Sequence, residues 1–164
     1  MRAAVIRNYN ADLSIETVRI SSLIGQTEGT LFVDFVYKGL PINPSTVHTF
    51  ASLGLQTSGN SSISVSAYSS TLYGRVNIST TIQASINFGT LVLGNRYKCA
   101  LSYKNNDVIF YVNGSLIGAD TNATIPALSD LYLQNANNNS KNINSVQLYK
   151  TRLTNAELAT LTTL

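Results

Sequence analysis

The stretch NRYKCALSYKNNDVIFYVNGSLIG, residues 95–118, decides the fold of this chain. Its first half alternates apolar with polar or small residues, the apolar ones being Tyr97, Cys99, Leu101 and Tyr103. Successive side chains of a strand point to opposite faces, so this pattern predicts a strand with one buried and one wet face. Residues 104–107 and Asn113-Gly114 then predict two tight turns, because Asn, Asp and Gly tolerate left-handed backbone. The stretch therefore predicts consecutive antiparallel strands.

The same rhythm runs through the rest of the sequence. Further strands are expected at residues 31–38, 47–55, 62–68, 72–78 (with a continuation through 80–88), 128–133 and 143–149. Turns or loops are expected at residues 25–29, 39–45, 58–61, 69–70, 119–126 and 134–142. Strands that recur every eight to twelve residues with turns between them are typical of a sandwich or jelly roll. The fold class predicted is all-β, a two-sheet antiparallel sandwich.

Only the end of the chain predicts a helix. Thr154 and Glu157 form a T-x-x-E capping box, in which each side chain satisfies a backbone donor at the helix start. Leu153 before the cap and Leu158 at the fourth helical position make the matching hydrophobic staple. We therefore expect one short C-terminal helix that turns Leu158 and Leu161 toward the sandwich.

Composition narrows the class of protein. The 164 residues suit a single domain, 1–164, and charged residues make up only 12% of them, about half the usual share. The net charge of +3 is scattered, so no nucleic-acid partner is predicted; Arg96, Lys98 and Lys104 read as a solvated strand face. There is no signal peptide and no apolar run of membrane-spanning length, so no membrane partner is expected. Cys99 is the only cysteine, which excludes an internal disulfide.

Two segments together resemble a known superfamily. Residues 98–114 carry K-x-A-x-x-Y-x-x-N-x-x-x-x-Y-V-N-G, and residues 143–158 carry I-x-x-V-x-I-Y-x-x-x-L-T-x-x-E-L with Leu148 for the middle Ile. With GTLFVDFVY at residues 29–37, they resemble laminin-G-like jelly-roll modules of the concanavalin A-like lectin/glucanase superfamily. R-L-T-x-A-E-L at residues 152–158 looks most like modules of tailed-phage structural proteins. The resemblance implies two packed antiparallel sheets with a sugar site on the concave face or at the rim loops.

The catalytic and metal-binding patterns of that superfamily do not appear in this sequence. Glucanase members carry E-x-D-x-x-E on one strand, and no acidic residues here have that spacing. His48 is the only histidine, read as an ordinary strand residue, so no Ser-His-Asp arrangement can be defended. We predict no enzyme, no catalytic residue, no metal site and no cofactor. A Ca²⁺ site at Asp120 and Asn122 stays open beside the reading that this Asp-x-Asn is only a turn.

A ligand site is predicted at Tyr68, Tyr73, Arg75 and Asn77, which flank a turn and lie on the polar face of their strands. Aromatic rings beside Asn and Arg suit the apolar faces and hydroxyl groups of sugars. The alternative is that these tyrosines cover the second sheet or an oligomer interface. The Asn-rich loop 134–142 could also bond a glycan or simply be solvated.

The function predicted is a non-catalytic surface module of a bacteriophage virion, such as a head fibre, tail fibre or decoration protein. It would adhere to a glycan or host-surface polysaccharide, contact other virion proteins and form a homo-oligomer, and it would be made in the host cytoplasm. Two alternatives stay open. One is a carbohydrate-binding module of a secreted bacterial protein, which would be extracellular, and the other is a purely structural assembly module.

Overall fold

The computed structural model describes residues 4–9, 17–19, 21–39, 47–54, 61–133 and 141–164. Within them, two six-stranded antiparallel sheets form a sandwich, as the sequence predicts. Sheet A has the order β1 (Ala4–Tyr9), β12 (Lys141–Tyr149), β3 (Glu28–Tyr37), β8 (Arg96–Lys104), β9 (Asp107–Val112) and β10 (Ser115–Asp120). Sheet B has the order β2 (Thr17–Arg19), β11 (Asp130–Tyr132), β4 (Val47–Gly54), β5 (Ser62–Tyr68), β6 (Thr71–Ile78) and β7 (Thr81–Thr90). A 3₁₀ turn, Ser21–Leu23, and the helix α1, Asn155–Thr162, complete the described part of the chain.

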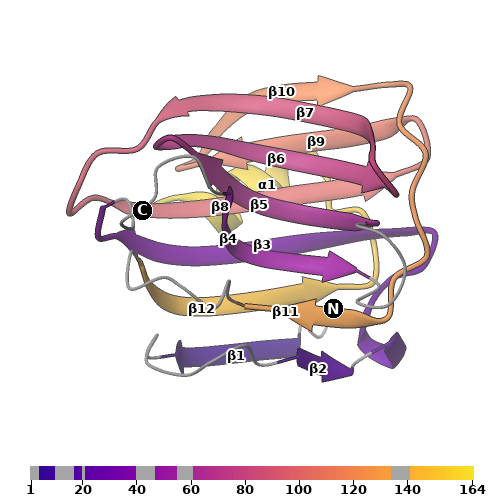
Figure 1. The fold of residues 1–164 in the computed structure, drawn as a ribbon, viewed down its shortest axis with the longest axis horizontal. Coiled ribbons are helices and arrows are strands. Elements are labelled where there is room, and N and C mark those ends of the chain that lie inside the picture. The colour runs from indigo at the N-terminus through magenta and orange to yellow at the C-terminus, as the bar shows by residue number, and fades with distance from the viewer. Residues whose placement is uncertain (1–3, 10–16, 20, 40–46, 55–60, 134–140) are drawn as a thin grey trace.

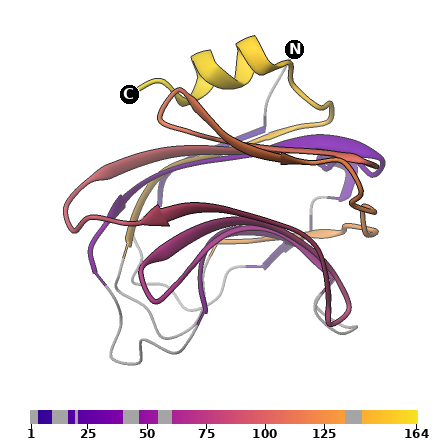
Figure 2. The same ribbon diagram turned by 90° about the horizontal axis from the view of Figure 1, so that it is seen from above.

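The layers are easy to follow in the figures. Sheet B lies in front of sheet A in Figure 1, and Figure 2 shows the two sheets edge-on with α1 on the outer face of sheet A. Sheet B arches in Figure 2 so that its outer face is the hollow one. No helix of the described residues covers that face, and it is where the candidate site lies. Among the described residues, no helix has the length and apolar character of a membrane span.

The three strands β8, β9 and β10 confirm the prediction made from residues 95–118. Asn106 adopts a φ of 59°, and Asn113 and Gly114 adopt φ values of 49° and 81°. Two consecutive residues with positive φ make the kind of two-residue turn whose twist matches the flanking strands. The Asn113 side chain also accepts a hydrogen bond from the backbone N–H of Lys98 (2.9 Å), which ties this turn to β8.

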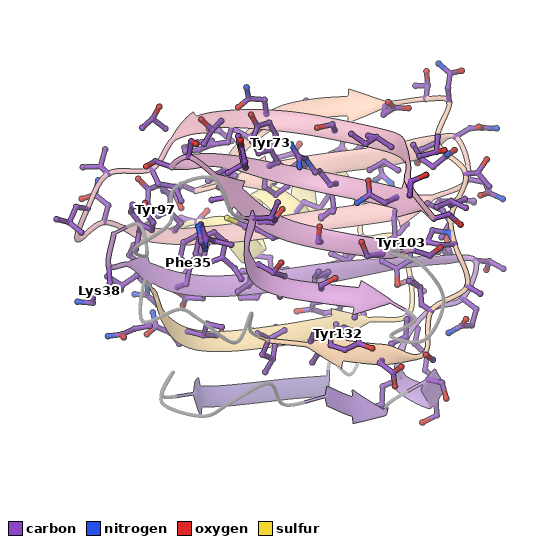
Figure 3. The ribbon with its side chains drawn as sticks, viewed as in Figure 1. Phe35, Lys38, Tyr73, Tyr97, Tyr103 and Tyr132 are labelled. Carbon is purple, nitrogen blue, oxygen red and sulfur yellow. The ribbon has the colours of Figure 1, made fainter. Side chains whose placement is uncertain are left out.

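The core fills the space between the two inner faces. Phe35 of β3 stacks on Phe50 of β4, with ring centroids 3.8 Å apart, and Tyr97 lies 5.6 Å from Phe35 (Figure 3). These rings come from both sheets, so they join the layers as well as exclude water. Cys99 is fully buried among them, and burial raises the pKa of its thiol, so it behaves as a small hydrophobe.

The prediction that the second face of β8 is wet is wrong for Ala100 and Ser102, whose exposed fraction is 0%. This face meets α1 and forms a second apolar cluster, which contains Phe32, Ala100, Ile109, Tyr111, Leu153 and Leu158. The Ser102 hydroxyl is satisfied inside by the Thr30 hydroxyl at 2.9 Å. Alternation within one strand shows which residues share a face, but it does not show that a helix some fifty residues later covers that face.

The C-terminal helix begins as the sequence predicts. Thr154 Oγ1 accepts a hydrogen bond from the Glu157 N–H (3.3 Å), and Glu157 Oε2 accepts one from the Thr154 N–H (2.8 Å). The bond from the Thr154 N–H and a second one from the Thr154 hydroxyl (2.8 Å) to this carboxylate hold the pKa of Glu157 below its ordinary value. Leu158 is fully buried and Leu161 is half-buried, so both turn toward sheet A to different degrees.

Some predicted boundaries differ from the structure. Residues 72–78 and 80–88 are two strands, because Ser79 adopts a φ of 53° and turns the chain between β6 and β7. The strand predicted at residues 128–133 is shorter, and the loop predicted from residue 119 begins after β10 ends at Asp120. Most of the predicted loops at residues 39–45, 58–61 and 134–142 lies outside the described residues.

Asp34 supplies a prediction about acid stability. Its carboxylate is buried on the outer side of sheet A, and burial alone would raise its pKa. Hydrogen bonds from Arg96 (2.9 Å to Nε) and Asn144 (3.0 Å) outweigh burial, so the pKa lies below its ordinary value. A carboxyl whose pKa is depressed on folding stabilises the fold above its unfolded pKa of about 3.9, and this is lost as pH falls through the folded pKa.

We therefore expect Asp34→Asn to lower the free energy of unfolding at pH 7 and to cost progressively less below about pH 4. Urea unfolding from pH 7 to pH 2 measures the gap between variant and wild type. Asp107→Asn is the control, because Asp107 is partly exposed where it pairs with Arg152 and exposed pairs contribute little. A gap for Asp34→Asn that is the same at pH 7 and pH 2 would contradict this explanation.

Candidate functional site

The outer face of sheet B is hollowed into a cleft of about 610 Å³. This volume falls within the usual range of small-ligand sites, about 300–1,000 Å³. The described residues that line it are Val47, Thr49, Ser52, Gly54, Ser61, Ser62, Ser64, Ser66, Arg75, Asn77, Ser79, Thr80 and Tyr132. Hydroxyl-bearing side chains dominate this set, and it contains no histidine and no carboxylate.

Strand alternation explains why β5 and β6 present polar side chains to the cleft. In β5, Ile63, Val65 and Ala67 are buried in the core, so the intervening Ser62, Ser64 and Ser66 point outward. In β6, Leu72 and Val76 face the core in the same way, which turns Arg75 and Asn77 outward. The register then places Ser64 beside Arg75 and Ser62 beside Asn77.

A β-bulge in β4, the third strand of the cleft, determines which of its residues face outward. In β4 the register shifts between Thr49 and Ala51, so that Phe50 and Ala51 are both buried in the core. An extra residue of this kind reverses which positions point outward beyond it. Thr49 therefore faces the cleft on one side of the bulge and Ser52 on the other, where Ser52 pairs with Ser64.

The floor of the cleft consists of hydroxyl groups. Ser52, Ser64 and Ser66 point away from the core and are nonetheless only 9%, 7% and 2% exposed. A serine hydroxyl donates one hydrogen bond and accepts two, so this floor can bond ligand hydroxyls in either direction. It is chemically suited to a polyhydroxylated ligand.

Arg75 is held in a fixed orientation above this floor. Its guanidinium carbon lies 4.2 Å from the centre of the Tyr73 ring, and its Nε donates to the Ser85 hydroxyl at 3.3 Å. A guanidinium over an aromatic ring gains cation–π attraction in addition to the hydrogen bond. Tyr73 is labelled in Figure 3, on the front face of sheet B.

Tyr132 of β11 forms another wall of the cleft (Figure 3). The Asp130 carboxylate beside it accepts hydrogen bonds from the Ser129 hydroxyl (2.7 Å) and the Tyr132 hydroxyl (3.4 Å). The second of these bonds restrains the tyrosine hydroxyl from within its own strand. The half-buried ring presents a flat, partly apolar surface to the cleft, of the kind that packs against the C–H face of a sugar ring.

The structure brings the predicted site residues together to different degrees. Arg75 and Asn77 line the cleft, while Tyr73 supports Arg75 from the same face without lining the cleft itself. Tyr68 is also on this face and is 43% exposed, but it lies at the end of β5, outside the lining. That any of the four contacts a ligand stays a prediction.

The sequence prediction missed Thr49, Ser52 and Tyr132. Thr49 and Ser52 lie on opposite sides of a bulge, and a strict alternation from Thr49 would have turned Ser52 inward. Tyr132 joins the cleft only because β11 pairs with β4 across 75 intervening residues, which no local pattern indicates. The run Ser62, Ser64 and Ser66 was a usable signal, since three alternating serines mark a polar outer face.

The residues considered as metal ligands or catalytic groups are not among the described residues that line the cleft. Asp120 Oδ1 accepts a hydrogen bond from the Asn122 N–H (2.8 Å), which is the geometry of an Asx turn and supports the turn reading. Within the described residues, no three His, Cys, Asp or Glu side chains are grouped to hold a metal. His48 is 3% exposed and pairs with Ala67, whose side chain belongs to the core.

A second hollow, of about 420 Å³, lies beside α1 on the outer face of sheet A. Its lining is mostly apolar and consists of Tyr149, Leu153, Ala156, Glu157, Thr160 and Leu161. It offers few hydrogen-bonding groups compared with the cleft on sheet B. A ligand rich in hydroxyl groups is therefore better matched by the cleft.

No protein-family model and no curated protein matches this sequence, but solved structures match it in fold. The CBM40 module of the Ruminococcus gnavus IT-sialidase, bound to α2,3-sialyllactose, has a TM-score of 0.72 at 15% identity, covering 98% of both chains. The leech intramolecular trans-sialidase, in complex with 2,7-anhydro-Neu5Ac, has a TM-score of 0.68 at 14% identity. The Trypanosoma rangeli sialidase has a TM-score of 0.63 at 20% identity.

Coverage differs between these matches. The alignment takes in 97% and 82% of this chain but only 27% of the leech enzyme and 22% of the trypanosomal one. The chain thus spans about a quarter of these sialidases and almost all of the CBM40 module. At such low identities the likeness shows a shared fold, a β-sandwich like that of a carbohydrate-binding module. The expected jelly roll fits at this level, while the tailed-phage module stays a prediction.

Proposed function

We propose that this chain is a non-catalytic carbohydrate-binding module and that its site is the cleft on the outer face of sheet B. The observation that carries the proposal is the cleft itself, whose floor of Ser52, Ser64 and Ser66 is bordered by Arg75 and Tyr132. Hydroxyl groups match the hydroxyl groups of a sugar, and a tyrosine ring can pack against its apolar face. The fold match to a module solved with sialyllactose supports the same function.

The chemistry of the lining favours binding over hydrolysis. Glycoside hydrolysis ordinarily uses two carboxyl groups placed on either side of the scissile bond. The described lining residues contain no carboxylate, and Asp130 next to it is bonded to Ser129 and Tyr132. The serines have no histidine beside them to act as a base, since His48 pairs with a core residue.

The setting of the module remains the finer part of the proposal. A carbohydrate-binding module of a secreted bacterial protein is supported by the fold match to a sialidase-associated module. A surface module of a phage virion is supported by the resemblance at residues 98–114 and 143–158. Both settings use the same cleft. Antibodies raised against the domain separate them, because they would label either purified phage particles or the secreted fraction of a bacterial culture.

A pair of matched tyrosines tests the position of the site. Tyr132 and Tyr149 are both half-buried, and each hydroxyl bonds the side chain two residues earlier, Asp130 or Gln147. Tyr132 lines the cleft on sheet B, and Tyr149 lines the apolar hollow beside α1. A glycan array of the purified domain is expected to give specific hits that Tyr132→Ala removes or weakens at least about tenfold and Tyr149→Ala retains.

The opposite outcome, in which Tyr149→Ala loses binding and Tyr132→Ala keeps it, would move the site to the other sheet. An array without hits for the folded wild type, in the presence and absence of Ca²⁺, would instead reject carbohydrate binding. Circular dichroism of each variant shows that the fold is retained.

A further inference from the structure

The charge of the cleft lining indicates which class of sugar the cleft would bind, which its hydroxyl floor does not. Among the described lining residues Arg75 is the only charged one. Three other cations of this chain face a carboxylate: Arg96 bonds Asp34, Lys104 faces Glu28 and Arg152 faces Asp107. Arg75 has no carboxylate partner among the described residues, so within this part of the chain its positive charge at the cleft has no counterion.

The guanidinium of Arg75 is also oriented to bind a planar group such as a carboxylate. Its Nε is used by Ser85 and one face of the guanidinium is covered by Tyr73, which fixes the plane of the group. The two terminal nitrogens bond no described residue. A guanidinium in this state can donate two parallel hydrogen bonds to a carboxylate, and such bidentate pairs are the strong ones. Because the group is already oriented, binding would cost less side-chain entropy.

We propose that the sugar bound in this cleft is acidic and that Arg75 binds its carboxylate, an inference that rests on the proposed function. The remainder of the ring would lie over the serine floor, where Ser64 is the register neighbour of Arg75. One positive charge matches the single negative charge of a carboxylate. The sugar is therefore either a sialic acid or a uronic acid, since both present a carboxylate on a polyhydroxylated ring.

Paired glycans that differ in the carboxylate test this assignment by isothermal titration calorimetry. The pairs are 3′-sialyllactose with lactose, and cellobiouronic acid with cellobiose. We expect the acidic member of one pair to bind at least about tenfold more tightly than its neutral partner. Whichever pair shows the preference identifies the source of the carboxylate. A sulfated sugar, 3′-sulfolactose, should bind more weakly than the preferred acidic sugar, because its sulfate is not planar.

Substitutions assign the preference to Arg75. Arg75→Gln should remove the difference between acidic and neutral sugars, and Arg75→Lys should retain only part of it, because lysine keeps the charge without the two-pronged geometry. Lys98→Gln removes one positive charge from the outer face of sheet A and should leave the preference unchanged. A preference that survives Arg75→Gln, or 3′-sulfolactose binding as tightly as the acidic sugar, would overturn the assignment.

The outcomes separate this inference from the proposed function. Equal binding of acidic and neutral sugars would overturn the carboxylate assignment while carbohydrate binding stands. Absence of binding to every sugar on a broad array would reject the proposed function and this inference with it.

Discussion

The double variant Ser52→Leu, Ser64→Leu is expected to lose glycan binding while the domain remains folded. The two serines are cross-strand neighbours at the centre of the cleft floor. Leucines there would remove two hydroxyl groups and fill part of the cleft with apolar atoms that satisfy no sugar hydroxyl. A loss of about 100-fold, equivalent to about 2.7 kcal/mol, would take a weak sugar site out of the measurable range. Apolar residues paired across neighbouring strands also stabilise a sheet, so the free energy of unfolding should not fall.

A second hydroxyl pair on the same face is the control. Thr71 and Thr90 are register neighbours on β6 and β7, outside the described lining of the cleft. Thr71→Leu, Thr90→Leu makes the same chemical change and should retain binding on the glycan array. Equal losses in both double variants would mean that the face as a whole, and not the cleft, determines binding.

The second large effect concerns how closely the two sheets approach. Gly74 of β6 faces the core, where an added Cβ would lie 2.8 Å from Phe110 Cγ and 2.9 Å from Leu101 Cδ1 of the opposite sheet. Ordinarily Gly→Ala in a strand gains about 0.5–1 kcal/mol. Here both facing side chains are fully buried, so the added methyl group would overpack the core. Overpacking costs about 1–3 kcal/mol, which should exceed the ordinary gain from replacing glycine. Gly74→Ala is therefore expected to lower the free energy of unfolding.

Urea unfolding followed by circular dichroism measures this effect. Gly118→Ala is the comparison and should cost less, because its added Cβ would meet a single atom, Ile86 Cγ2 at 2.9 Å, in place of two fully buried side chains. Combining Gly74→Ala with Phe110→Leu should cost less than the sum of the single changes, because the smaller residue leaves room for the methyl group. Strict additivity, or a stabilising Gly74→Ala, would contradict the packing described here.

The sequence predicts the strands well because strand patterns are local. Alternation shows which side chains of β8 enter the core, namely Tyr97, Cys99, Leu101 and Tyr103. The pair Asn113-Gly114 shows where the chain reverses. The capping box at Thr154 is local in the same way. Ala100 was assigned to the correct face of β8, but that face was wrongly expected to be wet, because α1, which covers it, is distant in the sequence.

The candidate site could be predicted only in part for the same reason. Arg75 and Asn77 share the polar face of one strand, so alternation brings them together. Thr49 and Ser52 needed a bulge to share that face, and Tyr132 needed the pairing of β11 with β4. Strand order is set by how the whole chain packs, which a single sequence does not display. That no carboxylate of the described residues faces Arg75 likewise became visible only in the assembled sheets.

The most direct test of the central claim, that the cleft on sheet B binds carbohydrate, is an NMR titration of the ¹⁵N-labelled domain with 3′-sialyllactose and cellobiouronic acid and, in parallel, with lactose and cellobiose. The account predicts that the backbone amide signals that shift with at least one of these four sugars belong to β4, β5 and β6 and to Tyr132, while those of α1 and β8 stay in place. Shifts gathered around α1, or no shift with any of the four sugars, would contradict it.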